Sequence, residues 1–518
     1  MRSEFSTMDA PAGVATPYAF AAALLVLWLL ASFFSPQNLR HIPTEGGPSL
    51  PILSLIGLYN FLSNGPEVLR RGYERHKGGA FKVALMSRWL VILSGKKLVD
   101  ELQKLPDDTV TSATMEVFDM QHVFGRPYHT DQMHIPLLRA LTRRLGAVFP
   151  DMFAEVQAAF GELVPATPDG WTPVHVFPLA STVVARATGR VFVGLPICRD
   201  PGYVRLITHF TDDATEALKM LTLAPAFLKG AVARRYTVVD ARVREMMGYL
   251  RPAVDARMAL AAQFGAEWAD KPDDLLQGII DAVVARGQGL HAAPAVRRLP
   301  GDRDDLRGAS PRRSTDHTLT LPQAVIHALY DLAVRPALAD ALRAEAHAAV
   351  AAHGWTKAGA GAMHRLDSFL RESQRLSGAL TVSMFRKLQK PVTLSDGTHL
   401  PAGTTLATPT LATHLDAAHY ADAARLAPLR FFAPEGKGQP RLETTAPDYL
   451  TFGHGRWACP GRFLAANELK AVVAYVLVHY DLRPERAGVR PQNVFRGLVV
   501  YPDAHAKVLF RKRMGGGM

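Results

Sequence analysis

A glycine-rich turn that carries a single cysteine constrains this chain more than any other feature. The turn runs from Phe452 to Gly461 and reads Phe-Gly-His-Gly-Arg-Trp-Ala-Cys-Pro-Gly. Its glycines Gly453, Gly455 and Gly461 tolerate positive φ and close approach of the backbone, because they have no Cβ. The turn therefore predicts a backbone that bends closely around something flat, with the side chain of Cys459 held out from it.

A helical pattern begins directly after the turn, at Arg462. The amino terminus of that helix would point at the Cys459 sulfur, where its partial positive charge and unpaired amide donors favour a thiolate over a thiol. A thiolate in this setting is a ligand for iron. The other interpretation of the same residues is a buried, inert cysteine that follows a glycine-rich turn.

The turn resembles the axial-cysteine loop of the cytochrome P450 family, whose pattern is Phe-x-x-Gly-x-Arg/His-x-Cys-x-Gly. The resemblance implies that haem b (iron protoporphyrin IX) is bound here, with Cys459 as the metal ligand. The cofactor-binding residues it implies in this loop are Cys459, Phe452, Gly455, Arg456, Trp457 and Gly461. Trp457 stands where the family usually has an arginine or histidine that donates to a haem propionate. Its indole N–H can still donate but carries no charge, so we expect weaker anchoring of the haem.

Charge and cysteine content narrow the classes of function. The chain has 518 residues and a formal net charge of +12, with 48% apolar residues, so a sizeable core is expected. The basic balance suits a surface that faces anionic membrane lipid or an acidic protein partner. Nucleic acid is disfavoured, since the arginines are scattered among apolar segments without a recognition motif. If Cys459 binds metal, no internal disulfide can form, and Cys198 is interpreted as a buried apolar filler.

A long uncharged stretch lies between Asp9 and Arg40, and its apolar centre reaches the roughly 20 residues that span a bilayer. We predict an uncleaved membrane anchor over 1–35, because a cleaved signal peptide needs a basic start and a small-residue cleavage site. Positive charge after the span places the C-terminal bulk in the cytosol. Prolines and glycines predict a stiff hinge over 36–51. Family members of the endoplasmic reticulum carry a similar hinge, so the resemblance implies a single-pass protein of that membrane.

The remainder predicts one domain over 52–512, with a tail of residues 513–518. Its fold class, with the resemblance, is mainly α with a small β part: a cytochrome P450 fold with an N-terminal transmembrane helix. The elements expected from the pattern are a helix from Pro66 to about Arg75, strands at 80–85 and 89–93, a mostly helical body to about Gln263, a helix at 274–281, and a hairpin with an Asp396-Gly397 turn.

The segment 297–313 interrupts this pattern. It holds two prolines and two glycines among alternating arginines and aspartates, a composition that breaks helices and stays in solvent. We therefore predict an atypical insert there, with the helical pattern resuming near Pro322. One hypothesis is a mis-joined or frame-shifted gene, which sequencing of the transcript tests.

The family has a long central helix in this part of the chain, with an acid-or-His/Thr/Thr kink where oxygen is activated. The nearest remnant of the kink here is His317-Thr318-Leu319-Thr320. The resemblance therefore implies Thr318 and Thr320 as candidate catalytic residues that deliver protons. The following segment 324–333 resembles the one that follows the kink in fungal members.

Glu372 and Arg375 lie three residues apart on an amphipathic helix predicted over 366–376, which on its own is an ordinary ion pair. The family, however, locks a Glu-x-x-Arg pair on this helix to the arginine of a later Pro-x-Arg-Phe segment, and Arg430 occupies that place here. A carboxylate held between two guanidiniums is a directional lock. Glu372, Arg375 and Arg430 are accordingly interpreted as structural.

Two further groups of residues have alternative interpretations. Arg139 and Arg143 lie in a stretch that resembles the family's propionate-binding helix, and the alternative is a pair of arginines on a solvated face. His414, Asp416 and His419 could form a metal site by composition, but the family's His-x-Asp-x-x-x-Tyr loop explains their spacing.

The resemblance implies a monooxygenase that inserts one oxygen atom of O2 into an apolar small molecule. Electrons would come from NADPH through a membrane-bound NADPH–cytochrome P450 reductase, for which basic residues such as Arg462 and Lys470 offer a docking face. Similarity to fungal members that oxidise terpenoids and sterols suggests a terpenoid or sterol-like secondary metabolite as substrate. The alternative is a degenerate haem-binding membrane protein, whose interrupted central helix cannot activate oxygen.

Overall fold

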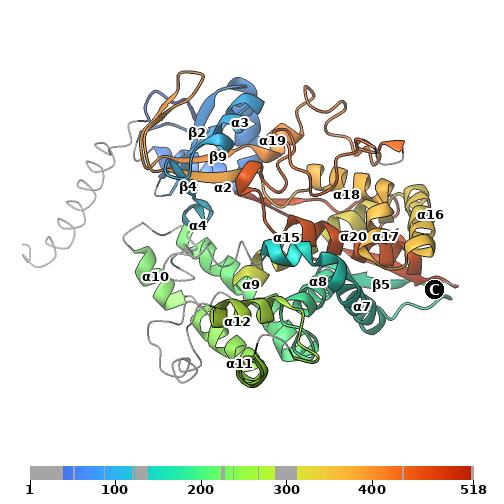
Figure 1. Cartoon of the computed structure of the whole chain (residues 1–518). Helices are drawn as coiled ribbons and strands as arrows, with labels where there is room; N and C mark the ends of the chain where they lie inside the picture. The colour runs from blue at the N-terminus through green and yellow to red at the C-terminus, as the bar shows by residue number, and fades with distance from the viewer. Residues whose placement is uncertain are drawn as a thin grey trace, which may run out of the picture.

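Strands from distant parts of the chain meet in one sheet, which Figure 1 shows in blue and orange beside the helical part of the molecule. The computed structural model describes residues 39–50, 53–86, 88–118, 122, 138–222, 224, 228–236, 239–265, 268–285, 312–434 and 437–514. Among these residues the sheet has the order β1-β2-β3-β9-β6-β4. Its strands are β1 (Thr44–Glu45), β2 (Ala80–Leu85), β3 (Arg88–Leu93), β9 (Thr405–Thr408), β6 (Ser383–Leu388) and β4 (Val110–Ser112).

Smaller sheets complete the β part, and helices make up most of the rest. A second sheet pairs β10 (Tyr480–Pro484), β13 (Lys507–Lys512) and β5 (Thr172–His175), and two hairpins pair β11 (Val494–Arg496) with β12 (Val499–Tyr501) and β7 (Val392–Thr393) with β8 (His399–Leu400). The longer helices are α2 (Ser54–Arg75), α3 (Lys96–Lys104), α7 (Leu145–Leu163), α8 (Val176–Phe192), α9 (Pro201–Thr222), α10 (Lys229–Tyr236), α11 (Val239–Phe264), α12 (Leu275–Ala285), α15 (Arg312–Ala333), α16 (Pro336–His353), α18 (His364–Leu376) and α20 (Arg462–His479). Short helices are α4 (Thr114–Val117), α17 (Lys357–Ala362), α19 (Thr410–His414) and the 3-10 turns Ile197–Arg199 and Gly455–Trp457.

The main core lies where α7, α8, α15, α18 and α20 pack together. Helix α15 packs against both α8 and α20 in this core. Helix α20 is buried on every side from Leu464 to Val478, which fits its nearly continuous apolar sequence. Cys198 lies in this core with no exposed surface, and burial raises the pKa of its thiol to about 11, so its prediction as a core filler is confirmed.

The predicted strands and the hairpin are confirmed, but the first helix starts earlier than predicted. Helix α2 begins at Ser54 and ends at Arg75, with a kink at Asn64 (φ −144°, ψ 49°). Pro66 therefore lies in the first turn after the kink, where its missing N–H has no helical partner to lose. Pro66, which predicted the start of a helix, lies instead just after the kink inside a longer helix.

The proline-rich hinge is also shorter than predicted. Within 36–51, Thr44 and Glu45 form strand β1, which pairs in parallel with Lys82 and Val83 of β2. The Glu45 carboxylate accepts a hydrogen bond from Arg75 Nη1 at 3.1 Å. The latter part of the hinge thus belongs to the folded domain, because its backbone adds an edge strand.

The central helix begins earlier than the sequence pattern indicated. Helix α15 starts at Arg312, ten residues before Pro322, so the prediction that helix resumes only near Pro322 and that the insert extends to 313 is wrong. Residues 312–321 contain neither glycine nor proline, and packing of the apolar second half stabilises the whole helix. Residues 297–311 of the predicted insert lie outside the described residues.

The predicted membrane anchor over 1–35 likewise lies outside the described residues. Within the ranges given above, no helix is both long enough and apolar enough to cross a bilayer.

Helix α20 carries an acid in the middle of the core. Glu468 has no exposed surface, and the Thr188 hydroxyl of α8 lies 3.0 Å from its carboxylate oxygens. Burial raises the pKa of Glu468 from 4.5 to about 8, so its carboxyl is mostly neutral in the folded protein at neutral pH.

This acid gives a pH-dependent stability. Because the folded pKa exceeds the unfolded one, the free energy of unfolding falls as pH rises from about 4.5 to about 8. We expect Glu468→Gln to raise stability at pH 8 relative to wild type by about 4 kcal/mol more than at pH 4.5. Urea unfolding at the two pH values measures this difference, and an equal effect of the substitution at both would contradict the buried neutral carboxyl.

Candidate active site

The cysteine loop is held in shape by its own backbone. The Cys459 amide donates to the Phe452 carbonyl at 2.9 Å, which closes the turn. Gly453 (φ 68°) and Gly455 (φ 74°) take the positive φ expected of them, and a Cβ on Gly455 would lie 2.2 Å from Gln103 Oε1 of α3. Gly461 differs from the expectation, because it adopts φ −84° and caps α20 instead. Helix α20 begins at Arg462, as predicted, three residues after the cysteine.

Trp457 and Arg386 present unpaired donors next to each other beside this loop. Trp457 Nε1 is buried, and among the described residues nothing accepts its hydrogen bond. Arg386 of β6 is 4% exposed, with its guanidinium carbon 5.4 Å from the centroid of the Trp457 ring. Its Nη1 donates to the Phe385 carbonyl at 2.8 Å, while its Nε is buried and unpaired. Two buried donors, one of them cationic, fit an external anion such as a carboxylate.

Burial lowers the pKa of Arg386 to about 10, with a further contribution from nearby Arg456. No carboxylate in the described part of the chain pairs with Arg386. A buried guanidinium without a counter-ion destabilises the folded protein, so a bound anion at this site would stabilise it. A haem propionate has this chemistry, and the donors therefore fit the cofactor that the sequence suggested.

A bulge in β6 is what brings Arg386 to this place. The pairing of β6 with β9 shifts register between Ser383 and Arg386, and Met384 inside the shift has φ 55°. A bulge re-aims the side chains that follow it. Sequence reasoning missed Arg386, because the bulge that brings it beside Trp457 depends on the pairing of β6 with β9.

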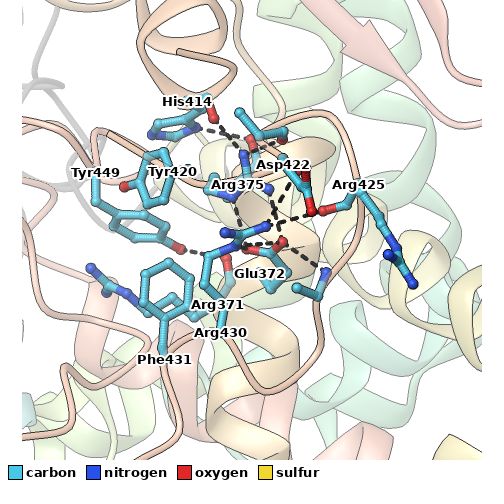
Figure 2. A network of polar contacts seen from close by, with 12 residues as sticks. Arg371, Glu372, Arg375, His414, Tyr420, Asp422, Arg425, Arg430, Phe431 and Tyr449 are labelled. Atoms are coloured by element: carbon cyan, nitrogen blue, oxygen red, sulfur yellow. Dashed lines mark hydrogen bonds and ion pairs between the residues drawn. The ribbon is translucent and has the colours of Figure 1, made fainter. Parts of the chain in front are cut away.

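Glu372 lies between two guanidiniums, as Figure 2 shows. Arg375 donates to both carboxylate oxygens, at 2.7 and 2.8 Å. Arg430 Nε lies 3.0 Å from both oxygens, and the Ala427 amide donates to one of them at 3.0 Å. Glu372 and Arg375 have no exposed surface, and the Arg430 side chain is 13% exposed. The remaining Arg430 donors bind backbone carbonyls, including that of Ala421 at 2.6 Å.

His414 connects this lock to the cysteine loop. Its Nδ1–H donates to the Arg375 carbonyl at 3.0 Å, and its Nε2 accepts from the Leu450 amide at 2.9 Å. The Leu450 carbonyl in turn accepts from the Gly453 amide at 2.9 Å. Burial lowers the pKa of His414 to about 3, so the ring stays neutral and keeps both roles. The lock and the loop are thus joined by one chain of hydrogen bonds.

The other predicted site residues have different surroundings. Arg456 is exposed and binds the Leu105 carbonyl and the Asp107 carboxylate, at 3.1 Å for the latter. Arg139 and Arg143 are exposed on the helical residues that precede α7. Their roles toward a cofactor stay predictions.

Lys470 contradicts the predicted docking face. It is 4% exposed, and its Nζ lies 2.9 Å from Asp367 Oδ1 of α18. It therefore stabilises the core through a buried ion pair and is not available to a partner. Arg462 is partly buried and donates to the Cys459 carbonyl at 2.9 Å, so it supports the loop.

The predicted catalytic threonines both lie on α15. Thr320 is exposed at the point where the helix enters the core, since Leu321 and the residues after it are buried. The side chain of Thr318 lies outside the described part of the chain. Pro322 sits inside the helix and cannot donate to the Thr318 carbonyl, which removes one helical hydrogen bond at this position.

Comparison with known proteins identifies a family model and several related sequences. Residues 318–510 match the family model described as "Cytochrome P450". The chain is 36% identical to Cytochrome P450 monooxygenase 151 of Postia placenta, over 96% of this chain and 99% of that protein. It is 33% identical to Cytochrome P450 monooxygenase CYP512U6 of Ganoderma lucidum, over 96% of each chain, and 30% identical to Cytochrome P450 monooxygenase paxQ of Penicillium paxilli, over 96% and 97%.

A solved structure resembles the fold as well. The match is to a chain described as "Retinoic acid bound cyanobacterial CYP120A1", with a TM-score of 0.67 and 18% identity. It covers 91% of this chain and 99% of that one. At this level of identity the two share the mostly helical architecture with its small sheets.

Proposed function

This chain belongs to the cytochrome P450 monooxygenase family, and on that premise we propose that Cys459 is the axial ligand of its haem iron. Membership of this family implies that the cofactor is haem b and that a reductase supplies the electrons. The observation that carries the proposal is the closed turn at Cys459, directly before the amino terminus of α20. When bound, the haem activates oxygen, and an axial thiolate favours O–O cleavage.

The chain's own residues hold and orient this group. We infer that Arg386 and Trp457 bind a haem propionate, because their buried donors have no partner among the described residues. The lock at Glu372, transmitted through His414, keeps the loop in position. The weaker anchoring expected from an uncharged Trp457 is offset by Arg386, which brings the missing positive charge from β6.

Thr320 is our candidate for proton delivery. Its side chain is exposed at the start of the buried half of α15. The helix is continuous from Arg312 to Ala333, which supports a working enzyme over a degenerate one. The disruption that motivated the degenerate alternative would then lie before Arg312, outside this helix.

Localisation and partners follow as further proposals. We propose that residues 1–35 anchor the protein in the endoplasmic reticulum membrane, with the catalytic domain in the cytosol. The reductase would be an NADPH–cytochrome P450 reductase of the same membrane. An apolar substrate fits a protein tethered to lipid. We propose a terpenoid or sterol-like secondary metabolite, which is the substrate class that the resemblance in the sequence implies.

Turnover with a reductase tests this function. The full chain and an NADPH–cytochrome P450 reductase are placed in the same vesicles and offered terpenoid and sterol substrates with NADPH. We expect NADPH-dependent products that contain one added oxygen atom from O2, traced by isotope-labelled oxygen. Haem binding without any NADPH-driven consumption of oxygen would instead support the degenerate haem protein.

The anion site gives a prediction for haem affinity. We expect Arg386→Met to weaken haem binding about 10- to 100-fold, because a charge-assisted hydrogen bond is lost. Arg456→Met is the comparison, since that guanidinium is already paired with Asp107. Haem loss to an acceptor protein measures both variants, and a larger loss for Arg456→Met would move the propionate contact to Arg456.

A further inference from the structure

The outward face of the second sheet gathers positive charge. Strand β13 is the middle strand of this sheet, and it pairs antiparallel with both β10 and β5. Side chains alternate between the two faces of a strand, and one face packs on the main core through Val508 and Phe510, which are 1% and 0% exposed. The opposite face is turned to solvent. Its charged residues are one acid and four cations: Asp481, Arg483, Lys507, Arg511 and Arg513.

Trp171 orients two of these arginines. It directly precedes β5, and the guanidinium carbons of Arg483 and Arg511 lie 4.3 and 4.7 Å from the centroid of its ring. Stacking on an aromatic ring fixes the plane of a guanidinium and leaves the N–H groups at its edges free to donate. The cationic groups are therefore pre-organised, which lowers the conformational entropy that a binding partner would have to overcome.

The positive charge of this face exceeds what the chain itself neutralises. Asp481 pairs with Arg511 at 2.9 Å and with Arg513 at 2.6 Å, so one carboxylate serves two arginines. In the part of the chain that the structure describes, no carboxylate lies within ion-pair distance of Arg483 or Lys507. The face therefore complements a partner that brings several carboxylates.

The position of this face in the fold separates it from the cysteine loop and from the N-terminal segment. Helix α20 begins directly after the cysteine loop and is followed at once by β10, so its 18 residues place the face about 27 Å from the loop. Figure 1 shows β5 and the C-terminal end of the chain on the side of the molecule away from the six-stranded sheet, to which β1 belongs. A reductase at the cysteine loop, or a membrane that holds residues 1–35, would therefore meet other surfaces.

We propose that the outward face of β5, β10 and β13 binds an acidic segment of a second protein, which is not the reductase. Arg483 and Lys507 donate to carboxylates of that segment, and Arg511 adds a further guanidinium edge. Exposed ion pairs are individually weak, so binding depends on several of them and on the fixed position of the arginines. The binding requires neither haem nor turnover and is independent of the proposed function.

Binding of a fluorescent oligoglutamate peptide to the full chain, held in nanodiscs of zwitterionic lipid, tests this face. We expect the double substitution Arg483→Gln and Lys507→Gln to raise the Kd of the peptide about 5- to 20-fold, because two exposed charge pairs are lost. The control is Arg251→Gln with Arg425→Gln, which removes the same charge from exposed arginines on α11 and in the segment after α19. It should raise the Kd by no more than about twofold. An equal effect of both pairs would show a response to net charge alone and would overturn the proposal.

Trp171→Leu separates the arrangement of the charges from their number. The substitution keeps every charge of the face, but the two arginines lose the ring that orients them. We expect the peptide to bind about 2- to 4-fold more weakly at an unchanged Tm. Binding equal to that of the wild type would show that Trp171 does not orient the arginines for a partner.

Two results would assign the face to a different partner and overturn the proposal. One is slower reductase-driven turnover in the double variant of Arg483 and Lys507, which would assign the face to the reductase. The other is binding of the nanodisc-held chain to phosphatidylserine vesicles that the same variant abolishes, while the wild type binds no peptide; this would assign the face to anionic lipid. Absence of a thiolate-type spectrum in the wild type would count against the proposed function, and the peptide comparison would still decide the role of this face.

Discussion

Glu372→Gln should lower the free energy of unfolding by about 3–5 kcal/mol, because it leaves the buried Arg375 and the largely buried Arg430 without their counter-charge. Arg375 has no exposed surface, and its Nε lies 2.7 Å from the carboxylate. Arg430 approaches the same carboxylate from a segment 58 residues later in the chain. The substitution keeps the size of the side chain, so the loss of stability comes from the missing charge and not from a change in volume. Urea unfolding of the full chain measures it.

A matched pair of charges on the surface provides the control. Glu67 of α2 also binds two arginines, Arg70 at 2.7 Å and Arg71 at 2.6 Å, which lower the pKa of its carboxyl to about 2. The arginines of this group are 46% and 60% exposed, so water screens the interaction. We expect Glu67→Gln to leave the free energy of unfolding nearly unchanged. An equally small effect of Glu372→Gln would contradict the lock.

Cys459→Ser should abolish both the thiolate-type spectrum and NADPH-driven turnover. A serine hydroxyl is not ionised at neutral pH and cannot replace the thiolate as a strong iron ligand. The loop itself should survive, because its closing bond from the residue 459 amide to Phe452 is made by the backbone. Carbon monoxide difference spectra and oxygen consumption measure the two effects, and circular dichroism checks the fold.

The other cysteine is the control for that substitution. Cys198 is buried in the core, 0% exposed, and packs against Gly189 of α8. We expect Cys198→Ala to lower stability by about 1 kcal/mol and to keep the spectrum and turnover. A thiolate-type spectrum that persists in Cys459→Ser and disappears in Cys198→Ala would reverse the assignment.

Local patterns in this sequence predicted local structure well. The turn before Cys459 and the start of α20 at Arg462 follow from glycine and helix signals within ten residues. The geometry of Glu372 with Arg375 follows from helical spacing, and that with Arg430 was suggested by the resemblance to the family. The turn, the helix start and the Glu372–Arg375 pair depend only on residues that are close together in the sequence.

Features that depend on distant contacts were missed. Arg386 faces Trp457 because of a bulge in β6 against β9, and no nearby residue pattern announces it. The burial of Lys470 was missed for the same reason, since only the fold brings it to Asp367. The start of α15 at Arg312 depends on tertiary packing of the second half of the helix, which overrides a weak local pattern.

The carbon monoxide difference spectrum of the reduced full chain tests the central claim most directly. It requires no substrate or reductase, and it reports haem binding and thiolate ligation in one experiment. We predict a red-shifted, thiolate-type Soret band for the full chain. Haem that binds without this band, or a folded chain that binds no haem, would contradict the assignment of Cys459 as the axial ligand.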